Sequence, residues 1–262
     1  MLTTEDPLLR RDTDSRGVIR LTLNRPQAFN SLSEAMIDAL QTEFEQIARD
    51  SAARCVVVAA AGRAFCAGHD LKEMRADPSL AYYQRLFEQC ARMMMAIQRL
   101  PVPVIARVQG IATAAGCQLV ASCDLAVASS AARFATPGVD IGLFCSTPMV
   151  ALSRNIGRKA AMEMLLTGEP IDGDKAVQIG LINKVVAPEI LEGETMLIAN
   201  KIASKPRGTL KIGKEAFYRQ LEMPLGEAYA YASQVMTENM LDGEACEGIS
   251  AFLEKREPKW PS

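Results

Sequence analysis

Three short apolar segments in the first half of the chain, each followed by a turn and a helical pattern, constrain the fold most strongly. VIRLTL spans residues 18–23, CVVVAA spans 55–60 and PVIARV spans 103–108. Continuous apolar runs of this length are typical of buried strands. Strands separated by single helices indicate an α/β layer fold.

Helical patterns fill the intervals and dominate the second half. Capping and proline signals predict helices over about 33–50 and 81–100. After Thr147 the pattern is mostly helical, with INKVV as a short strand, and four helices are predicted between 189 and 255. The sequence therefore predicts an α/β core with a helical C-terminal appendage.

Composition narrows the class of protein. A chain of 262 residues with 49% hydrophobic content builds a substantial core, and a net charge of -2 gives no reason to expect nucleic acid or an anionic membrane as partner. The apolar region 102–132 is interrupted by charged residues and glycines, so we expect no membrane span.

The cysteines and the N-terminus bear on the compartment. Seven cysteines without a CxxC spacing indicate reduced, mostly buried thiols. The first residues mix acids and bases without an apolar leader core. We expect a cytoplasmic location, or the mitochondrial matrix if a leader was removed.

The common catalytic templates are missing from the sequence. It contains no GxxxxGK[ST], GxGxxG, GxSxG or HExxH motif, and it has a single histidine. With no cysteine pair at ligand spacing either, we expect no metal site.

Two loops of the same kind remain, each joining a strand to the start of a helix. In GRAFCAGHDLKEM, Asp70 is predicted to cap a helix, and the amides of His69 and Asp70 have no partner within it. In GIATAAGCQLV a helix is predicted to begin near Ala115, whose amide is also free and lies at the positive end of the helix dipole. Two such donors facing one another would form an oxyanion hole.

Other interpretations of the same residues stay open at this point. The small side chains of Ala114, Ala115 and Gly116 suit a ligand that approaches the main chain, but they also suit close packing of a helix on a sheet. The His69 imidazole suits a base near neutral pH, yet the residue could also contribute its backbone amide alone.

A series of ordered motifs then resembles the crotonase (enoyl-CoA hydratase/isomerase) superfamily over nearly the whole chain. The motifs are NRPQAFNS, GRAFCAGHDLKEM, PVPVIARVQGIATAAGCQLVASCDLAVAS, FATPGVDIGLFCSTP and LLTGEPIDGDKAVQIGLINKVV. The resemblance implies a crotonase-type ββα spiral core over 1–200 and a helical trimerisation region over 201–262, with trimers that often pair into hexamers. It also implies an acyl-CoA thioester as ligand, with coenzyme A as part of the substrate and no covalently bound cofactor.

The family's functional positions fall on specific residues of this chain. Its two oxyanion amides match His69 and Ala115, the donors inferred above from the loops. Its positions that contact coenzyme A match Gln27, Ala28, Asp70, Leu71 and Lys72. Lys72 suits the pyrophosphate, although a solvated helix charge is an equal alternative. Phe252 and Lys255 match positions that reach the coenzyme A of a neighbouring subunit.

The sequence departs from the family at both hydratase glutamates, which are replaced by Gln118 and Gly138. A carboxamide does not titrate in this range, and glycine has no side chain. Each lost proton-transfer group costs about 10² to 10⁴ in rate. Asp140 is a candidate substitute, because in a strand it would lie on the same face as Gly138.

Two neighbouring residues, Cys145 and Ser146, are further candidates. Ser146 falls where dienoyl-CoA isomerases and an aryl-CoA dehalogenase of the family place a working aspartate, but we expect its hydroxyl to cap the helix that Pro148 starts. Cys145 has no obvious base, so a buried thiol is expected.

Two functions are consistent with these observations. One is an acyl-CoA enzyme acting through the oxyanion hole, with weak hydration or isomerisation, or with thioester hydrolysis for which Gln118 places water. The other is a non-catalytic acyl-CoA binding or regulatory protein, in which Gln118→Glu with Gly138→Glu should restore hydration. A purely structural trimer has no positive feature in its favour.

Overall fold

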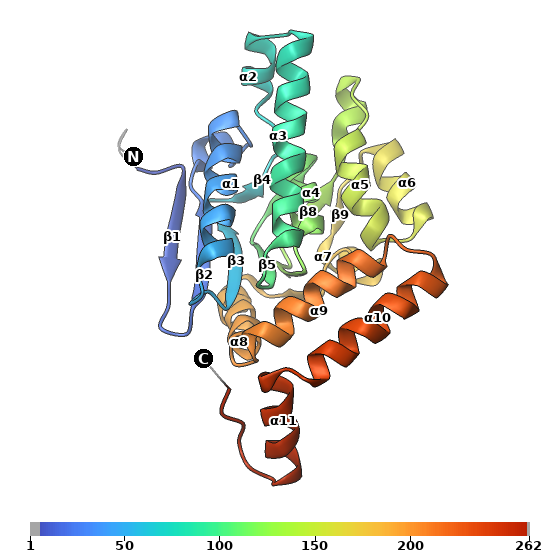
Figure 1. The fold of residues 1–262 in the computed structure, drawn as a ribbon. Coiled ribbons are helices and arrows are strands. Elements are labelled where there is room, and N and C mark those ends of the chain that lie inside the picture. The colour runs from blue at the N-terminus through green and yellow to red at the C-terminus, as the bar shows by residue number, and fades with distance from the viewer. Residues whose placement is uncertain (1–5, 261–262) are drawn as a thin grey trace.

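The computed structural model describes residues 6–260 and contains two β-sheets covered by helices (Figure 1). The strands of the larger sheet are β1 (Leu9–Thr13), β2 (Val18–Leu23), β3 (Cys55–Ala60), β5 (Val104–Val108), β7 (Leu125–Ser129) and β10 (Lys184–Val186). Those of the smaller sheet are β4 (Ala64–Cys66), β6 (Ile111–Thr113), β8 (Arg133–Ala135) and β9 (Ile171–Asp172). Their orders are β1-β2-β3-β5-β7-β10 and β4-β6-β8-β9.

Successive strands alternate between the two sheets, which produces a repeated spiral turn. The first strand of each pair β3/β4, β5/β6 and β7/β8 joins the larger sheet, and the second joins the smaller one. Within each sheet these strands pair in parallel. This is the predicted ββα spiral, and it brings the ends of β4 and β6 together.

Helices complete each turn and form the C-terminal region. The helices that accompany the sheets are α1 (Glu34–Arg49), α2 (Leu71–Ala76), α3 (Leu80–Arg99), α4 (Ala115–Ser122), α5 (Ser146–Asn155), α6 (Arg158–Thr167), α7 (Gly173–Gln178) and α8 (Leu191–Ala203). The last three are α9 (Arg207–Gln220), α10 (Leu225–Met240) and α11 (Gly243–Leu253). Three 3-10 helices are η1 (Pro26–Ala28), η2 (Pro137–Ile141) and η3 (Pro188–Ile190).

The predicted elements agree closely with those observed. The segments 18–23, 55–60 and 103–108 correspond to β2, β3 and β5, and the four helices predicted after residue 189 correspond to α8 through α11. Ser33 caps α1 as expected, because its hydroxyl accepts a hydrogen bond from the amide of Met36 at 3.2 Å. Between residues 6 and 260, no helix combines the length and apolar character needed to cross a bilayer.

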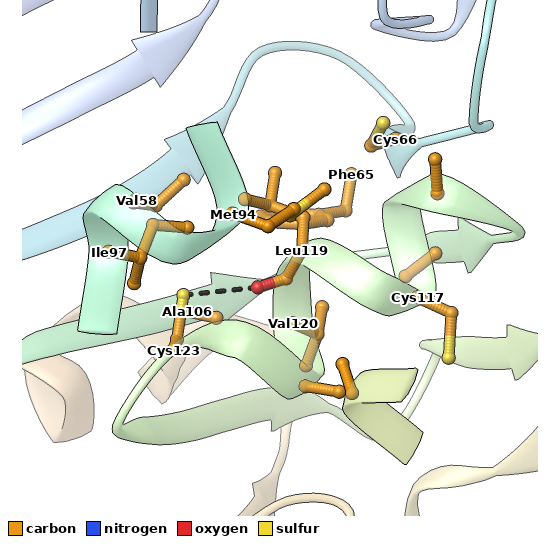
Figure 2. Close-up of a cluster of buried hydrophobic side chains, with 14 of the residues drawn as sticks. Val58, Phe65, Cys66, Met94, Ile97, Ala106, Cys117, Leu119, Val120 and Cys123 are labelled. Atoms are coloured by element: carbon orange, nitrogen blue, oxygen red, sulfur yellow. Dashed lines mark hydrogen bonds between the residues drawn. The ribbon is translucent and has the colours of Figure 1, made fainter. Parts of the chain in front are cut away.

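The main core lies between the larger sheet, α1, α3 and α4. Figure 2 shows part of it, where Phe65 and Met94 pack over Leu119 of α4. Six of the seven cysteines are buried and Cys246 is exposed, and all are free thiols, in agreement with the expectation of mostly buried, reduced cysteines. Burial raises the pKa of the Cys66 thiol to about 12, so this group is protonated at neutral pH.

The helices α9 to α11 leave the core and extend along one side of the molecule (Figure 1). A buried ion pair fixes α9 to the core, since Lys214 Nζ lies 2.7 Å from Asp124 Oδ2 and also donates to the carbonyl of Val102 at 3.0 Å. The Tyr218 hydroxyl donates to the other oxygen of Asp124 at 2.8 Å. Because α8 spans residue 200, a division between helices would fall at 204–206 rather than at the predicted 200.

Candidate functional site

The two loops singled out in the sequence meet at the ends of β4 and β6. These strands pair in parallel, and the Thr113 hydroxyl donates to the carbonyl of Ala67 at 3.2 Å. Gly68 packs directly on the start of α4, because a Cβ at this glycine would lie 2.9 Å from Ala114 Cβ and 3.3 Å from the nitrogen of Ala115. The residue after Gly68 is therefore held beside the first turn of α4.

His69 has a free backbone amide because of the way its neighbours pair with Leu32. Leu32 donates to the carbonyl of Gly68 at 2.8 Å, and Asp70 donates to the carbonyl of Leu32 at 3.1 Å. This parallel bridge directs the intervening amide of His69 to the opposite side. Within residues 6–260 that amide has no hydrogen-bond acceptor. The prediction of a free Asp70 amide was wrong, since Leu32 occupies it.

Ala115 supplies the second free amide as the first residue of α4. The preceding Ala114 donates to the carbonyl of Ala135 at 2.9 Å, but the amide of Ala115 has no acceptor in the described part of the chain. Ala114 itself has φ of 50° and ψ of -119°, which is a strained conformation for a residue with a side chain. Strain of this kind persists where the surrounding structure enforces it, which here sets the direction of the next amide.

Both amide-bearing residues line a cavity with a volume of about 780 Å³. Its walls are mostly apolar and come from α2, α3 and the segment from η2 to the start of α5. Prominent side chains among them are Leu71, Met74, Phe87, Leu143, Phe144 and Pro148. Sequence reasoning missed Phe87 and the 141–144 segment, because nothing in the helical or turn patterns separates a cavity wall from an ordinary surface.

The two interpretations of the small residues apply to different positions: the structure shows the packing role for Gly116, and the role in ligand approach stays a prediction for Ala114 and Ala115. A Cβ on Gly116 would lie 2.1 Å from the carbonyl oxygen of Cys66, so this glycine serves close packing of α4 on β4. Ala114 and Ala115 line the cavity, where short side chains leave the main chain accessible to a ligand.

The His69 imidazole is not a base near neutral pH. Burial lowers its pKa to about 4, and its Nε2 has no hydrogen-bond partner among the described residues. The ring packs edge-on against Phe87 with 5.5 Å between ring centroids. Of the two roles left open for His69, the free amide favours the backbone role, and an imidazole whose pKa is lowered to about 4 is a weak base at neutral pH.

The two positions of the family glutamates differ in their surroundings. Gln118 is 5% exposed and is not among the residues that line the cavity, and its Oε1 has no partner within the described chain. Gly138 does line the cavity, but a Cβ there would lie 2.4 Å from the carbonyl oxygen of Leu143 and 2.9 Å from Cys145 Sγ. The recovery of hydration by Gln118→Glu with Gly138→Glu stays a prediction, and any side chain at position 138 requires the segment after η2 to shift.

The segment from 137 to 146 differs from the expectation in two more ways. Residues 137–141 form the 3-10 helix η2 rather than a strand, so Gly138 and Asp140 do not share a strand face. Asp140 is exposed, although it borders the cavity. Ser146 does not cap α5: it is the first helical residue, and its hydroxyl donates to the carbonyl of Phe144 at 3.3 Å.

Cys145 borders the cavity as a protonated thiol. The side chain is 7% exposed, and burial raises its pKa. This agrees with the prediction of a buried thiol rather than a nucleophile.

The residues matched to coenzyme A contacts fall into two groups. Gln27 and Lys72 are exposed, Ala28 is half-buried in η1, and Leu71 borders the cavity. The carboxylate of Asp70 is already engaged, since it caps α2.

Asp70 also lies 2.7 Å from Arg25 Nη1, a partner that sequence reasoning missed. Burial acts to raise the pKa of Asp70, but the Arg25 hydrogen bond and the α2 amides outweigh it and hold the pKa below its ordinary value. Asp70 is therefore an ionised cap that orders the loop carrying His69.

Phe252 and Lys255 lie far from this cavity. Phe252 is 82% exposed near the end of α11, and Lys255 follows that helix with φ of 56°. Figure 1 places α11 at the opposite end of the molecule from α2. These residues therefore do not reach the cavity of their own chain. Across residues 6–260, no group of three or more His, Cys, Asp or Glu side chains is arranged to hold a metal ion.

One protein-family model matches nearly the whole chain. Residues 13–262 match the family model described as enoyl-CoA hydratase/isomerase. The chain is 50% identical over 244 residues to the enoyl-CoA hydratase domain-containing protein 3, mitochondrial, of Xenopus laevis, covering 93% of this chain and 83% of that protein. The human protein of the same name is 48% identical over 253 residues, covering 95% and 84%.

Solved structures give the same result. A crystal structure of an enoyl-CoA hydratase from Mycobacterium smegmatis is 62% identical with a TM-score of 0.96, covering 97% of this chain and 99% of that one. The crystal structure of the human enoyl-CoA hydratase domain-containing protein 3 is 47% identical with a TM-score of 0.94, covering 97% and 100%. The wording of the FATPGV and AAGCQLVASCD segments predicts this group within the superfamily, and the prediction is confirmed.

Proposed function

The chain belongs to the enoyl-CoA hydratase/isomerase family, and we propose that it binds acyl-CoA thioesters with the thioester oxygen between the amides of His69 and Ala115. The observation that supports this most strongly is the pair of free amides at the same cavity, held together by the contact of Gly68 with the start of α4. A thioester carbonyl that gains negative charge is the ligand that such donors favour.

In the proposed reaction the protein supplies oxyanion stabilisation and little proton transfer. Negative charge on the thioester oxygen, in an enolate or a tetrahedral intermediate, is stabilised by two fixed donors, each worth about 10² to 10³ in rate. Ordinary hydration of an enoyl-CoA also needs groups that deliver and remove protons, and Gln118 and Gly138 supply neither. Hydration is therefore slow, and a reaction that depends mainly on the oxyanion hole, such as thioester hydrolysis by water, suits the remaining groups better.

A second candidate is a non-catalytic acyl-CoA binding protein. It is favoured by the titratable groups at the cavity, since burial lowers the pKa of His69 to about 4 and raises the pKa of Cys145. Apart from the exposed Asp140, the described lining residues then contain no general base at neutral pH. A cavity whose lining residues have so few groups able to transfer protons favours binding without turnover.

Three assays on the wild-type protein test these proposals. Calorimetry with butyryl-CoA measures binding, the loss of crotonyl-CoA absorbance measures hydration, and thiol release measures thioester hydrolysis. We expect binding with hydration far slower than that of a family member with both glutamates. Thiol release supports the enzyme, and binding without either product supports the second candidate. If no CoA ester binds, both are wrong.

Assembly and location are further parts of the proposal. The helices α9 to α11 expose large apolar side chains, including Phe217 at 56% and Leu241 at 82%, which supports a homotrimer or a hexamer of two trimers. In such an assembly Phe252 and Lys255 would contact the coenzyme A of a neighbouring subunit. Light scattering measures the mass of the assembly.

We propose a cytoplasmic location. The alternative is the mitochondrial matrix, because the names of the vertebrate relatives contain the word mitochondrial, and cell fractionation tests the two.

A further inference from the structure

The cavity beside the two amides also restricts which acyl group fits. We propose that it takes a plain hydrocarbon chain of medium length, about six to ten carbons, and rejects acyl groups that end in a carboxylate. This inference rests on the proposed acyl-CoA function and specifies its substrate class.

The cavity has room for an acyl group longer than a short one. At roughly 30 Å³ per carbon, which is the share of one water in the liquid, a four-carbon acyl group fills about 120 Å³. The cavity has a volume of about 780 Å³. An eight-carbon chain of about 240 Å³ leaves room for the arm of coenzyme A that carries the thioester.

The walls are apolar on both sides of the amides. Leu71 and Phe87 come from α2 and α3, and Leu143 and Phe144 come from the segment between η2 and α5. Three of these side chains are strongly exposed for apolar residues: Leu71 is 49%, Leu143 is 50% and Phe144 is 43% exposed. A hydrocarbon chain that lies between them would cover this surface, which is favourable because apolar area leaves water.

The charges at the cavity exclude a second carboxylate. Of the described residues that line it, Asp140 is the one acidic side chain, and burial lowers the pKa of His69 to about 4, which keeps that ring neutral at pH 7. No lysine or arginine belongs to that lining set. A terminal carboxylate on the acyl chain would lose water without gaining a cationic partner, and Asp140 would repel it.

Calorimetry with saturated CoA esters tests the inference on the wild-type protein. The ligands are acetyl-CoA, butyryl-CoA, octanoyl-CoA and suberyl-CoA, the last being the eight-carbon ester with a terminal carboxylate. Each fully buried methylene is worth up to about fourfold in affinity. We expect octanoyl-CoA to bind at least about tenfold more tightly than butyryl-CoA, and suberyl-CoA at least about tenfold more weakly than octanoyl-CoA.

A variant that reverses the preference gives the sharper test. Leu143→Lys places an ammonium group on the cavity wall at a half-exposed position. It should weaken octanoyl-CoA binding and strengthen suberyl-CoA binding, each by about tenfold. Leu197→Lys on α8 is the matched control, because Leu197 is 65% exposed and does not line the cavity. This control should bind both esters as the wild type does.

The possible outcomes separate this inference from the proposed function. If butyryl-CoA, octanoyl-CoA and suberyl-CoA bind equally, or if Leu197→Lys shifts the preference as much as Leu143→Lys, the acyl-chain inference is wrong while acyl-CoA binding stands. If no CoA ester binds to the wild-type protein, the proposed function fails and this inference fails with it. Circular dichroism of both variants confirms that they fold.

Discussion

The two halves of the cavity differ in how they are built. One half consists of backbone, with the amides of His69 and Ala115 held by strand pairing and by the contact of Gly68 with α4. The other half consists of side chains and the segment after η2, and it includes Gly138, one of the two positions matched to the family glutamates. The first half carries the two proposed oxyanion donors, and the second has Asp140 as its one acidic side chain among the described lining residues.

This difference determines which substitutions each half of the cavity tolerates. The residues that carry the two amides line the cavity where β4, β6 and α4 pack closely, so a larger side chain at Gly68 or Gly116 disturbs the core. A glutamate on a cavity wall contributes chemistry rather than packing, and its replacement leaves the fold intact. At position 138, however, a side chain would overlap the Leu143 carbonyl and Cys145 Sγ, so this glycine is also required for packing.

The largest effect is expected from Gly116→Ala in the backbone half. Its new methyl group would lie 2.1 Å from the carbonyl oxygen of Cys66, so α4 must shift away from β4. We expect a loss of about 3 kcal/mol in the free energy of unfolding and loss of CoA ester binding. Denaturant titration and calorimetry measure the two effects.

Gly193→Ala is the matched control for that variant. Gly193 lies within α8, and a Cβ there would meet nothing within 4 Å. Alanine should stabilise this helix by about 0.5 to 1 kcal/mol. Equal effects of the two substitutions would show that the backbone half is not held by close packing.

A smaller effect is expected from restoring the glutamates. The Gly138→Glu variant, alone or with Gln118→Glu, should lose about 2 kcal/mol in unfolding free energy, because its Cβ overlaps the Leu143 carbonyl. It should not gain hydration of crotonyl-CoA, since the carboxylate cannot take the productive position without moving that segment. A large gain in the hydration rate at unchanged stability would contradict this account of the side-chain half.

The pKa of the His69 imidazole tests the role of the ring separately from the role of the backbone amide. Its pKa is lowered from 6.5 to about 4, so the unfolded chain binds more protons between these values. The stabilisation is fully present above pH 6.5 and is lost as the pH falls toward 4, with a slope of up to about 1.4 kcal/mol per pH unit. His69 is the single histidine, so one imidazole NMR signal reports its pKa directly. A measured value near 6.5 would make the ring a candidate base again.

The smallest effect concerns Ser146 at the start of α5. Its hydroxyl bonds to the carbonyl of Phe144 and caps no amide, so Ser146→Ala should change the unfolding free energy by less than about 0.5 kcal/mol. Ser33→Ala, which removes a true cap on α1, should cost about 1 kcal/mol. Thermal unfolding of the two variants compares them, and similar losses would mean that Ser146 caps its helix after all.

Features that depend on local sequence patterns could be predicted from the sequence. Elements with strong local signals were found, such as β3 as an apolar run and α9 after Pro206. The free amide of Ala115 follows from the strand, turn and helix pattern alone, whereas that of His69 also depends on the pairing of its neighbours with Leu32, and the oxyanion role of both amides stays a prediction. The resemblance to the family matches its two oxyanion amides to the same two residues.

What could not be predicted depends on contacts between distant segments. The short strands β4, β6 and β8 have three residues each and carry too weak a pattern. The pairing of Leu32 with Asp70, the ion pair of Arg25 with Asp70 and the carbonyl of Leu143 over Gly138 are tertiary contacts that no local rule contains. For that reason the sequence assigned Asp140 to a strand and left the Asp70 amide free.

The central claim is that one thioester oxygen accepts hydrogen bonds from both free amides. A crystal structure of the protein with octanoyl-CoA measures this directly. The account predicts that the amide nitrogens of His69 and Ala115 each lie about 2.7 to 3.1 Å from the thioester oxygen. A bound ester whose carbonyl oxygen contacts neither nitrogen, or contacts the Gln118 side chain instead, would contradict it.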